Sequence, residues 1–349
     1  MDPRFKKLAE VLVFHSMKVA PTEKVILHQI DAVPDEFMVA LIRAVRLAGG
    51  YPMVWHQSNV LHRELLMHAT SSELEATLAL RRKADRMVMK QAAAYVGVRG
   101  AANSFEEADV PQEAQAAWMK GYLVPVHFQV RVPHTKWVVL RWPTPSMAQK
   151  AKMSTEAFTE FFFRVCTLDY SALETAMCPL KDLWDQTDKV KITGPGTDIT
   201  FSIKGIPAVI CAGEHNIPDG ELFGAPILDS VEGVITFNTP TTYQGKQFAG
   251  VKLVVEAGRI VEATCQSGDP EKLNAILDTN EGSRFFGEFA IGVNPRITSA
   301  MDEILFDEKI RGSIHLTPGQ CYKEAPNGNN KATIHWDMVQ IQTEDFVPA

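Results

Sequence analysis

Cysteine is scarce in this 349-residue sequence and forms no recognisable framework. The five cysteines are scattered, and none forms a Cys-x-x-Cys pair. This spacing excludes a disulfide scaffold and a zinc knuckle, and it is typical of reduced, mostly buried thiols in a cytoplasmic protein. Long apolar runs are also lacking, since Glu10 interrupts the first one and no other approaches the length of a membrane span. We therefore expect a cytoplasmic chain with neither a signal peptide nor a membrane partner.

Several familiar catalytic signatures are missing as well. No Gly-x-Ser-x-Gly elbow of a serine hydrolase occurs. Gly97-Val-Arg-Gly100 lacks the glycine pattern of a dinucleotide-binding turn. His62 and His68 are too far apart in sequence for the i, i+4 pair that a zincin helix presents to one metal. These absences exclude three common enzyme classes and leave other metal chemistry open.

Charge is distributed unevenly along the chain. Residues 1–189 carry 23 lysines and arginines against 21 acidic residues, whereas residues 190–349 carry 12 against 21. The second half therefore holds the whole acidic surplus. Such a field favours cations and disfavours phosphate backbones, so we expect no nucleic-acid partner.

The first half alternates strand and helix patterns. Apolar runs bounded by glycine and proline predict strands, and the amphipathic stretches between them predict helices. This order predicts an α/β N-terminal domain over residues 1–188, with a mainly parallel sheet. The expected strands are Val25–Gln29, Pro52–His56, Ala94–Val98 and Trp137–Arg141, and the expected helices are Pro34–Ala48, Val60–Lys90, a helix capped by Ser154 and Ala172–Trp184.

The pattern changes after about residue 189. Val190–Ser202 contains two alternating runs around Gly194-Pro-Gly196, which predicts a hairpin. Further short runs at Gly233–Asn238, Gly250–Glu256 and Arg259–Cys265 predict more strands, and one helix is expected at about 270–278. We predict a β-rich α+β catalytic domain over residues 189–349.

Five residues of this second half are candidate metal ligands. They are the acids and imidazoles of short strand-like segments, namely Glu221, Glu288, His315, His335 and Asp337. Carboxylate oxygens and imidazole nitrogens suit divalent cations, and burying them unpaired is costly. Because side chains alternate along a strand, His335 and Asp337 are expected on one face while Trp336 packs on the other. For the same reason His315 is expected on the face opposite to Ile314 and Leu316.

Simpler interpretations exist for each candidate. Glu221 alone could be a solvated turn residue, and a strand histidine such as His315 is usually only hydrogen-bonded. Glu288 lies among apolar residues and needs a cation as a partner. That cation could be a metal ion, or it could be the side chain of Arg284 or Arg296. His215 could support the site or have no role in it.

Motifs of modest length, in a specific order, resemble the aminopeptidase T and aminopeptidase S family of two-metal exopeptidases. They are Lys136–Gln149, Asn216-x-Pro-x-Gly-Glu221, Gly287-Glu-x-x-Ile-Gly-x-Asn294, Glu308-Lys-Ile-x-Gly-Ser-Ile-His315, Tyr322 and His335-x-Asp337. The resemblance implies an α/β domain, a β-rich catalytic domain, a homodimer and peptide substrates with a free N-terminus.

The resemblance also implies two divalent metal ions, which mixed oxygen and nitrogen ligands allow to be Zn, Co, Mn or Mg. The positions that match the family's metal centre are Glu221, Glu288, His315, Tyr322, His335 and Asp337. Among these, Glu288 and Tyr322 are the expected catalytic residues. We expect Glu288 to bridge the two ions and Tyr322 to donate a hydrogen bond to the oxyanion. Glu221 and His315 are assigned to one ion, and His335 and Asp337 to the other.

Two other functions remain open. His315, His335 and Asp337 match the donor set of a non-heme Fe(II) oxygenase, and a ring-cleaving dihydroxypyridine dioxygenase group looks like a distant relative. Glu221 and Glu288 would then be surplus ligands. A non-catalytic, metal-stabilised binding protein is the other alternative, although structural sites are usually closed and rich in cysteine.

Overall fold

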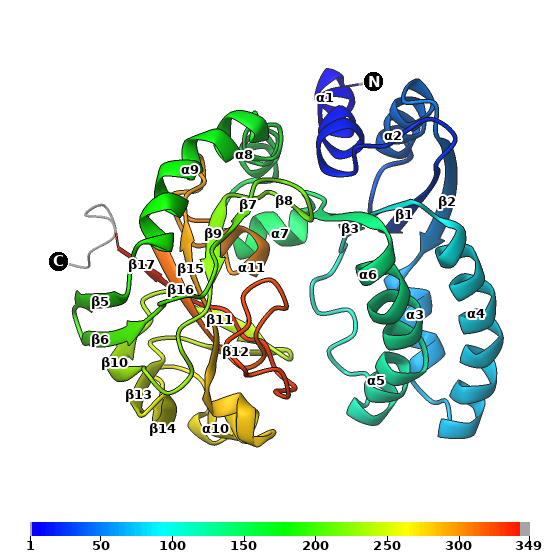
Figure 1. Cartoon of the computed structure of the whole chain (residues 1–349). Helices are drawn as coiled ribbons and strands as arrows, with labels where there is room; N and C mark the ends of the chain where they lie inside the picture. Colours follow the sequence, from blue (N-terminus) through cyan, green and yellow to red (C-terminus); the bar gives the residue numbers. More distant parts are fainter. Residues whose placement is uncertain (1, 343–349) are drawn as a thin grey trace. The chain divides into compact units, whose positions relative to one another are not determined.

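The computed structural model describes residues 2–342, which fall into two compact units (Figure 1). The N-terminal unit comprises Met1–Leu168 and Gly213–Ile217, and the C-terminal unit comprises Asp169–Ala212 and Pro218–Ala349. The expected division at residue 188 stays a prediction about domains, and the compact units place helix α9 (Tyr170–Asp185) with the C-terminal sheets. No helix in the described part of the chain is long and apolar enough to cross a membrane.

The N-terminal unit is built on a parallel sheet with the strand order β2-β1-β3-β4-β8. β1 is buried over consecutive residues, which indicates that both faces of the sheet are covered. β2 lies on one side of β1, and β3, the next strand along the chain, lies on the other side. The strands are β1 (Lys24–Asp31), β2 (Tyr51–Gln57), β3 (Ala94–Gly100), β4 (Lys136–Arg141) and β8 (Asn216–Ile217).

Helices cover this sheet. Ile26 of β1 belongs to a core cluster with Leu74, Leu78 and Val126, so the helices that carry these residues pack on one face. α2 also contacts β1 and β2. The helices are α1 (Pro3–Glu10), α2 (Asp35–Leu47), α3 (Asn59–Leu66), α4 (Ser71–Gln91), α5 (Gln112–Trp118), α6 (Val132–His134), α7 (Pro145–Lys150) and α8 (Thr155–Cys166), with two π-helical segments, η1 (Val11–Ser16) and η2 (Met119–Arg131).

The single helix expected over residues 60–90 is wrong in one respect, because two helices occupy this stretch. Ser58 accepts a hydrogen bond at the start of α3, and Thr70 begins α4 with a capping box that it shares with Glu73. A reciprocal cap of this kind satisfies orphan backbone N–H groups and starts a new helix. The sequence Thr70-x-x-Glu73 contained this signal.

The C-terminal unit contains two larger antiparallel sheets and a two-stranded ribbon. One sheet has the order β14-β13-β10-β6-β5 and includes the expected hairpin as β5 and β6, and the other has the order β17-β16-β15-β9-β7. The strands are β5 (Lys189–Gly194), β6 (Thr197–Ser202), β7 (Val209–Cys211), β9 (Glu221–Gly224), β10 (Glu232–Thr236), β11 (Thr241–Tyr243), β12 (Lys246–Phe248), β13 (Lys252–Glu256), β14 (Arg259–Thr264), β15 (Phe286–Gly292), β16 (Ser313–Pro318) and β17 (Met338–Ile341).

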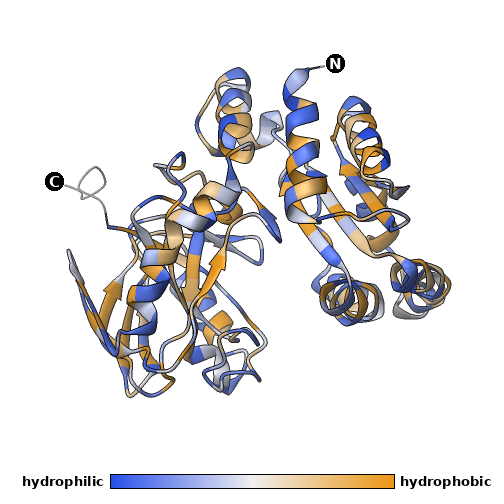
Figure 2. Ribbon diagram, turned by 45° about the horizontal axis from the view of Figure 1, so that its top comes forward, coloured by the Kyte–Doolittle hydropathy of each residue, from blue (hydrophilic) through white to orange (hydrophobic). Residues whose placement is uncertain are grey.

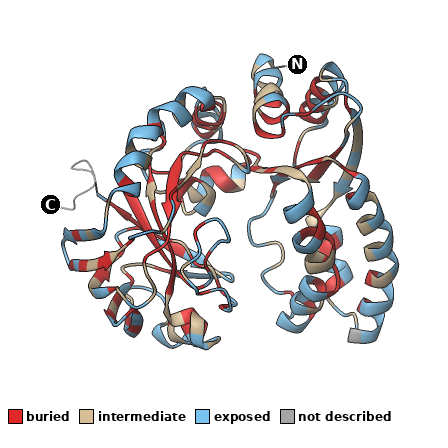
Figure 3. Cartoon of the chain, in the orientation of Figure 1, coloured by how far each residue is buried: buried red, intermediate tan, exposed pale blue. Residues whose placement is uncertain are grey.

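Apolar side chains from both sheets and from α9 form the core of this unit. Figure 2 colours the ribbon by hydropathy and shows hydrophobic segments along the strands of this unit. Trp184 of α9 stacks on Phe289 of β15, with ring centroids 5.1 Å apart, and Phe201 of β6 meets the same ring edge-on. β15 and β16 are buried along almost their whole length (Figure 3). The remaining helices are α10 (Pro270–Leu277), η3 (Glu281–Arg284) and α11 (Ile304–Asp307).

The predicted fold class is confirmed, because a parallel α/β unit is followed by a β-rich unit. All five cysteines are free thiols. Only Cys166 and Cys321 are buried, while Cys178 is exposed, so the expectation of mostly buried thiols is met in part.

Candidate metal centre

Three of the predicted ligands lie on one face of the sheet that contains β9, β15 and β16. Leu222, Phe289 and Leu316 point into the core of the C-terminal unit. Side chains alternate along a strand, so Glu221 and His315, each adjacent to one of these core residues, point to the opposite face. Glu288 precedes Phe289 and lies on that face too, after an irregularity in register near Gly287. All three side chains are buried.

The two histidines approach different oxygens of Glu288. His315 Nε2 lies 3.4 Å from Glu288 Oε1, and His335 Nε2 lies 3.0 Å from Glu288 Oε2. On one side, Glu221 Oε2 lies 3.7 Å from His315 Nε2. On the other, Asp337 Oδ1 lies 3.3 Å from His335 Nε2. The structure therefore brings together all five residues that the sequence singled out.

The segment that carries His335 and Asp337 differs from the prediction. β17 begins only at Met338, and His335 forms an isolated bridge with Gly319. The predicted strand over these residues is therefore wrong, but the alternation of side chains holds. Trp336 is buried and stacks on Tyr243, with centroids 4.9 Å apart, while His335 and Asp337 face Glu288.

Neighbouring groups fix the orientation of these two side chains. His335 Nδ1 lies 2.8 Å from the backbone carbonyl oxygen of Gln320, which can accept a hydrogen bond only from a protonated Nδ1. Nε2 is then directed at the carboxylates. Thr317 Oγ1 donates a hydrogen bond of 2.7 Å to Asp337 Oδ1. Contacts of this kind orient metal ligands in known metalloproteins.

Two polar atoms of the cluster have no hydrogen-bond partner among the described residues. They are Glu221 Oε2 and His315 Nδ1, and both are buried. An unsatisfied buried carboxylate oxygen is costly, and a cation beside it would remove that cost. Three carboxylates and two imidazoles are also a donor set that divalent metals accept. The residues therefore fit a metal centre.

Electrostatics within the cluster point in the same direction. Burial works to lower the pKa of His315, but Glu288 and Glu221 outweigh it and raise that pKa to about 9. Burial likewise opposes the charge of His335, whereas Asp337 and Glu288 raise its pKa well above the ordinary value. The carboxylates of the cluster therefore favour positive charge at this site.

Lys309 is a member of the site that the sequence did not single out. Its side chain is fully buried, its Nζ forms an ion pair with Glu221 Oε1, and it lies 2.8 Å from Glu308 Oε1 and 3.5 Å from Asp219 Oδ1. Burial opposes its charge, but these three acids raise its pKa well above the ordinary value. Lys309 therefore holds the oxygen of Glu221 that faces away from His315.

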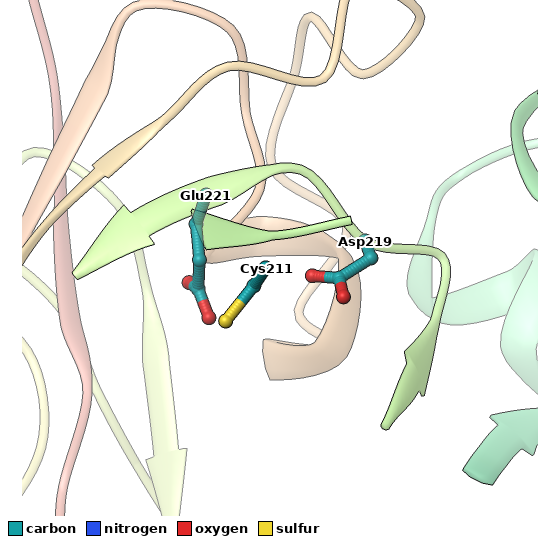
Figure 4. Close-up of side chains that lie close together, drawn as sticks. All are labelled: Cys211, Asp219 and Glu221. Carbon is teal, nitrogen blue, oxygen red and sulfur yellow. The ribbon is translucent and has the colours of Figure 1, made fainter. Parts of the chain in front are cut away.

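Cys211 and Asp219 lie beside Glu221 (Figure 4). Cys211 comes from β7 and pairs in register with Glu221 of β9, so its thiol points toward the Glu221 carboxylate. Burial, together with Asp219 and Glu221, raises the pKa of the Cys211 thiol well above its ordinary value. The group is therefore a neutral thiol, and Asp219 is satisfied in part by Lys309.

The remaining candidates occupy other positions. Tyr322 is 45% exposed as a residue, and its ring lies 4.8 Å from that of His335. Burial of its phenol and the nearby Glu288 and Asp337 raise the pKa of Tyr322 well above the ordinary value. Arg284 pairs with Asp278 and not with Glu288, which removes one simpler interpretation of Glu288. His215 belongs to the N-terminal unit, where it stacks on Trp137.

A buried cluster of carboxylates and imidazoles on a β-rich unit is typical of a metal-dependent enzyme. The model of the thermophilic metalloprotease family M29 matches residues 1–347, and the chain belongs to this family. It is therefore a metallopeptidase. The predicted family and the predicted enzyme class are confirmed.

The relatives carry the name aminopeptidase. Aminopeptidase PepS of Streptococcus thermophilus is 25% identical over 97% of this chain and 92% of its own length. Aminopeptidase T of Thermus aquaticus is 31% identical over 42% of this chain and 41% of its own length.

Two solved structures share the fold. AmpT from Thermus thermophilus superposes with a TM-score of 0.80 and 22% identity, covering 98% of this chain and 96% of that one. The 2,5-dihydroxypyridine dioxygenase from Pseudomonas putida KT2440 gives a TM-score of 0.57 and 16% identity, covering 96% and 91%. At these identities both likenesses concern the fold alone.

Proposed function

We propose that the chain is an aminopeptidase that removes N-terminal residues from peptides with two divalent metal ions. The observation that carries this proposal is the position of Glu288 between two histidines, one at each of its oxygens. A carboxylate placed in this way suits a bridge between two cations. The unpartnered oxygen of Glu221 supports the same conclusion.

The other four donors divide into two groups around Glu288. Glu221 and His315 lie on one side, and His335 and Asp337 on the other, so each side offers one imidazole and one carboxylate besides the bridge. When bound, a pair of divalent ions supplies an activated water nucleophile and a Lewis acid for the peptide carbonyl. Zn, Co, Mn and Mg are all compatible with these donors.

The chain's own residues then prepare the site for a substrate. Gln320 and Thr317 hold His335 and Asp337 in place, and Lys309 holds Glu221. We assign to Tyr322, whose ring contacts that of His335, the hydrogen bond to the oxygen that gains negative charge during attack. An acidic residue or a metal near the rim would bind the free α-amino group of the peptide, which explains a restriction to chain ends.

The same proposal includes a cytoplasmic homodimer, as in the family that the sequence resembles. It includes neither a nucleic-acid partner nor a membrane partner, because the acidic surplus lies in the half that holds the cluster.

Hydrolysis of aminoacyl-p-nitroanilides by the metal-loaded chain tests the proposal. We expect turnover by the wild type, and a loss of at least about a hundredfold in kcat/KM for Glu288→Gln and for His335→Ala. Lys181→Met, which removes an exposed charge paired with Asp185, is the matched control and retains wild-type activity.

Full activity in either ligand variant would refute the assignment of these residues. Oxygen consumption with one iron per chain, in place of peptide hydrolysis, would favour the ring-cleaving dioxygenase. A melting temperature that rises with metal, without turnover of any peptide, would favour a metal-stabilised binding protein.

A further inference from the structure

The N-terminal unit contains a cavity of about 490 Å³, built entirely from residues of that unit. Its lining includes Ile30, Gln57, Gly100 and Arg141, which lie at or beside the carboxyl ends of β1, β2, β3 and β4. In this sheet β2 lies on one side of β1, whereas β3 and β4 follow on the other side. The direction in which successive strands are added to the sheet therefore reverses between β1 and β3. The crevice outside the strand ends at such a reversal is the usual ligand position of open α/β sheets. The cavity therefore occupies a favourable place for a ligand.

Arg131 is the most informative residue of the lining. It is only 7% exposed, and its Nη1 has no hydrogen-bond partner among the described residues. Its Nε donates a hydrogen bond of 3.1 Å to His127 Nδ1, and its guanidinium lies over the rings of Tyr95 and Trp137. No carboxylate of the described residues forms a salt bridge with it. Burial lowers the pKa of Arg131 to about 10, which still leaves a full positive charge at neutral pH.

Other groups near Arg131 also carry positive charge or donate hydrogen bonds. Arg99 and Arg141 also line the cavity. His127 accepts from Arg131 through Nδ1, so in its neutral form Nε2 carries the hydrogen and can act as a donor. A buried cation that carries an unpaired donor atom, next to further cations and a donor imidazole, is complementary to an oxyanion.

An aromatic wall leads away from Arg131. The rings of Trp118 and Tyr122 stack with centroids 4.3 Å apart, and His62 meets Trp118 at 4.4 Å. His62 Nδ1 and Glu107 Oε1 are 2.7 Å apart, so Glu107 is engaged at the end of the wall that lies beyond Trp118. The lining of the cavity thus combines the positive charge of Arg131 with aromatic side chains, and it also includes Glu106 and Glu107.

The backbone that supplies part of this lining is unusual. His127 and Arg131 belong to η2, a π-helical segment of 13 residues that contains Pro125. π-Helical geometry is rare and is frequently found at functional sites. It is therefore a second observation, independent of the side-chain charges, that favours a binding role.

We propose that this cavity binds a small organic anion, with a carboxylate or phosphate monoester group at Arg131 and an apolar body against Trp118 and Tyr122. All lining residues of this site belong to the N-terminal unit, and none of them is a proposed metal ligand.

Calorimetric titration of the full-length, metal-loaded chain tests the proposal with 3-phenylpropionate and phenyl phosphate as probes. We expect one of them to bind with a Kd below about 1 mM, and the neutral 3-phenylpropanol to bind at least about tenfold more weakly. Preference for phenyl phosphate, with measurable binding of inorganic phosphate, would identify a phosphate ligand. Preference for 3-phenylpropionate would identify a carboxylate.

Variants distinguish this cavity from the metal cluster. Arg131→Met should weaken the preferred probe at least about tenfold, whereas Arg164→Met, which removes an exposed guanidinium over Phe161, should leave its Kd unchanged. Ser104→Trp, at an exposed position of the lining, should also block binding and does not disturb a buried charge. Binding should persist after the metal is removed with a chelator.

Three results would overturn the proposal. They are no binding of either anion at 10 mM (about ten times the expected upper limit), equal binding by Ser104→Trp and the wild type, and loss of binding on chelation. Each can occur whether or not the chain hydrolyses peptides, so failure here and failure of the aminopeptidase proposal are separable.

Discussion

Buried histidines behave in opposite ways in the two units. In the N-terminal unit, burial and then nearby arginines lower the pKa of His28 and of His127 to about 3. In the C-terminal unit, His315 is buried even more completely, yet Glu288 and Glu221 raise its pKa to about 9. Burial disfavours the charged imidazole in both places. The sign of the neighbouring charges therefore decides the outcome.

The comparison explains why the two units suit different ligands. Carboxylates gathered around His315 and His335 create a demand for cations, which fits metal ions. Burial, and then nearby arginines, keep the imidazoles of His28 and His127 neutral, and the arginines favour an anion beside them. The sequence shows the same difference in its overall charge, because the acidic surplus lies in the second half.

Removal of Lys309 should have the largest effect on stability, and it concerns the acidic cluster of the C-terminal unit. Lys309→Met leaves Glu221, Glu308 and Asp219 facing one another in the interior without their cation. We expect the free energy of unfolding of the metal-free chain to fall by about 3–5 kcal/mol, measured by urea denaturation.

Lys181→Met is the control for this experiment, because its ion pair with Asp185 is exposed and should contribute no more than about 1 kcal/mol. Divalent metal should recover part of the stability of Lys309→Met. An equally small loss in both variants would show that the buried cation does not stabilise the acids.

Low pH should destabilise the chain through the buried histidines of the N-terminal unit. The pKa of His127 is about 3 in the folded chain and 6.5 ordinarily, so the unfolded chain binds a proton there that the folded chain does not. Stability is therefore complete above pH 6.5 and falls as the pH drops toward 3, by about 1.4 kcal/mol per pH unit for this residue.

His127→Gln removes that proton uptake and keeps an acceptor for Arg131. We expect the free energy of unfolding of this variant to fall less steeply between pH 6.5 and pH 4 than that of the wild type, as measured by urea denaturation at each pH. Identical slopes would mean that His127 is already protonated in the folded chain.

Thr317→Val should have the smallest effect of the three. The change keeps the shape of the side chain but removes the hydrogen bond to Asp337 Oδ1. We expect metal affinity, measured by competition with a chelating dye, to fall about tenfold, which corresponds to about 1.4 kcal/mol. The fold should be unaffected, and unchanged affinity would show that Asp337 needs no such support.

Strand alternation allowed much of the C-terminal site to be predicted from sequence. His315 lies between Ile314 and Leu316, and the two-residue period placed it away from the core, as the structure shows. Glu288 was expected to need a cationic partner because apolar residues surround it, and it is indeed buried. Local pattern was sufficient in both cases.

Other features depend on contacts that no local pattern encodes. Lys309 faces its sequence neighbour Glu308 and also Asp219 and Glu221, which come from a much earlier segment, and only the folded chain brings these two segments together. His335 and Asp337 precede β17 in an irregular segment, because bridge pairing to Gly319 replaces a continuous strand. The cavity at Arg131 combines β1–β4 with η2, so its charge pattern was invisible in the linear order.

Metal content per chain tests the central claim most directly. After loading with a divalent metal and desalting, elemental analysis should find two ions per wild-type chain and fewer in Glu288→Gln, because Glu288 contacts both histidines. A wild type that retains one ion or none, or a Glu288→Gln chain that still retains two, would contradict the account of a metal pair bridged by Glu288.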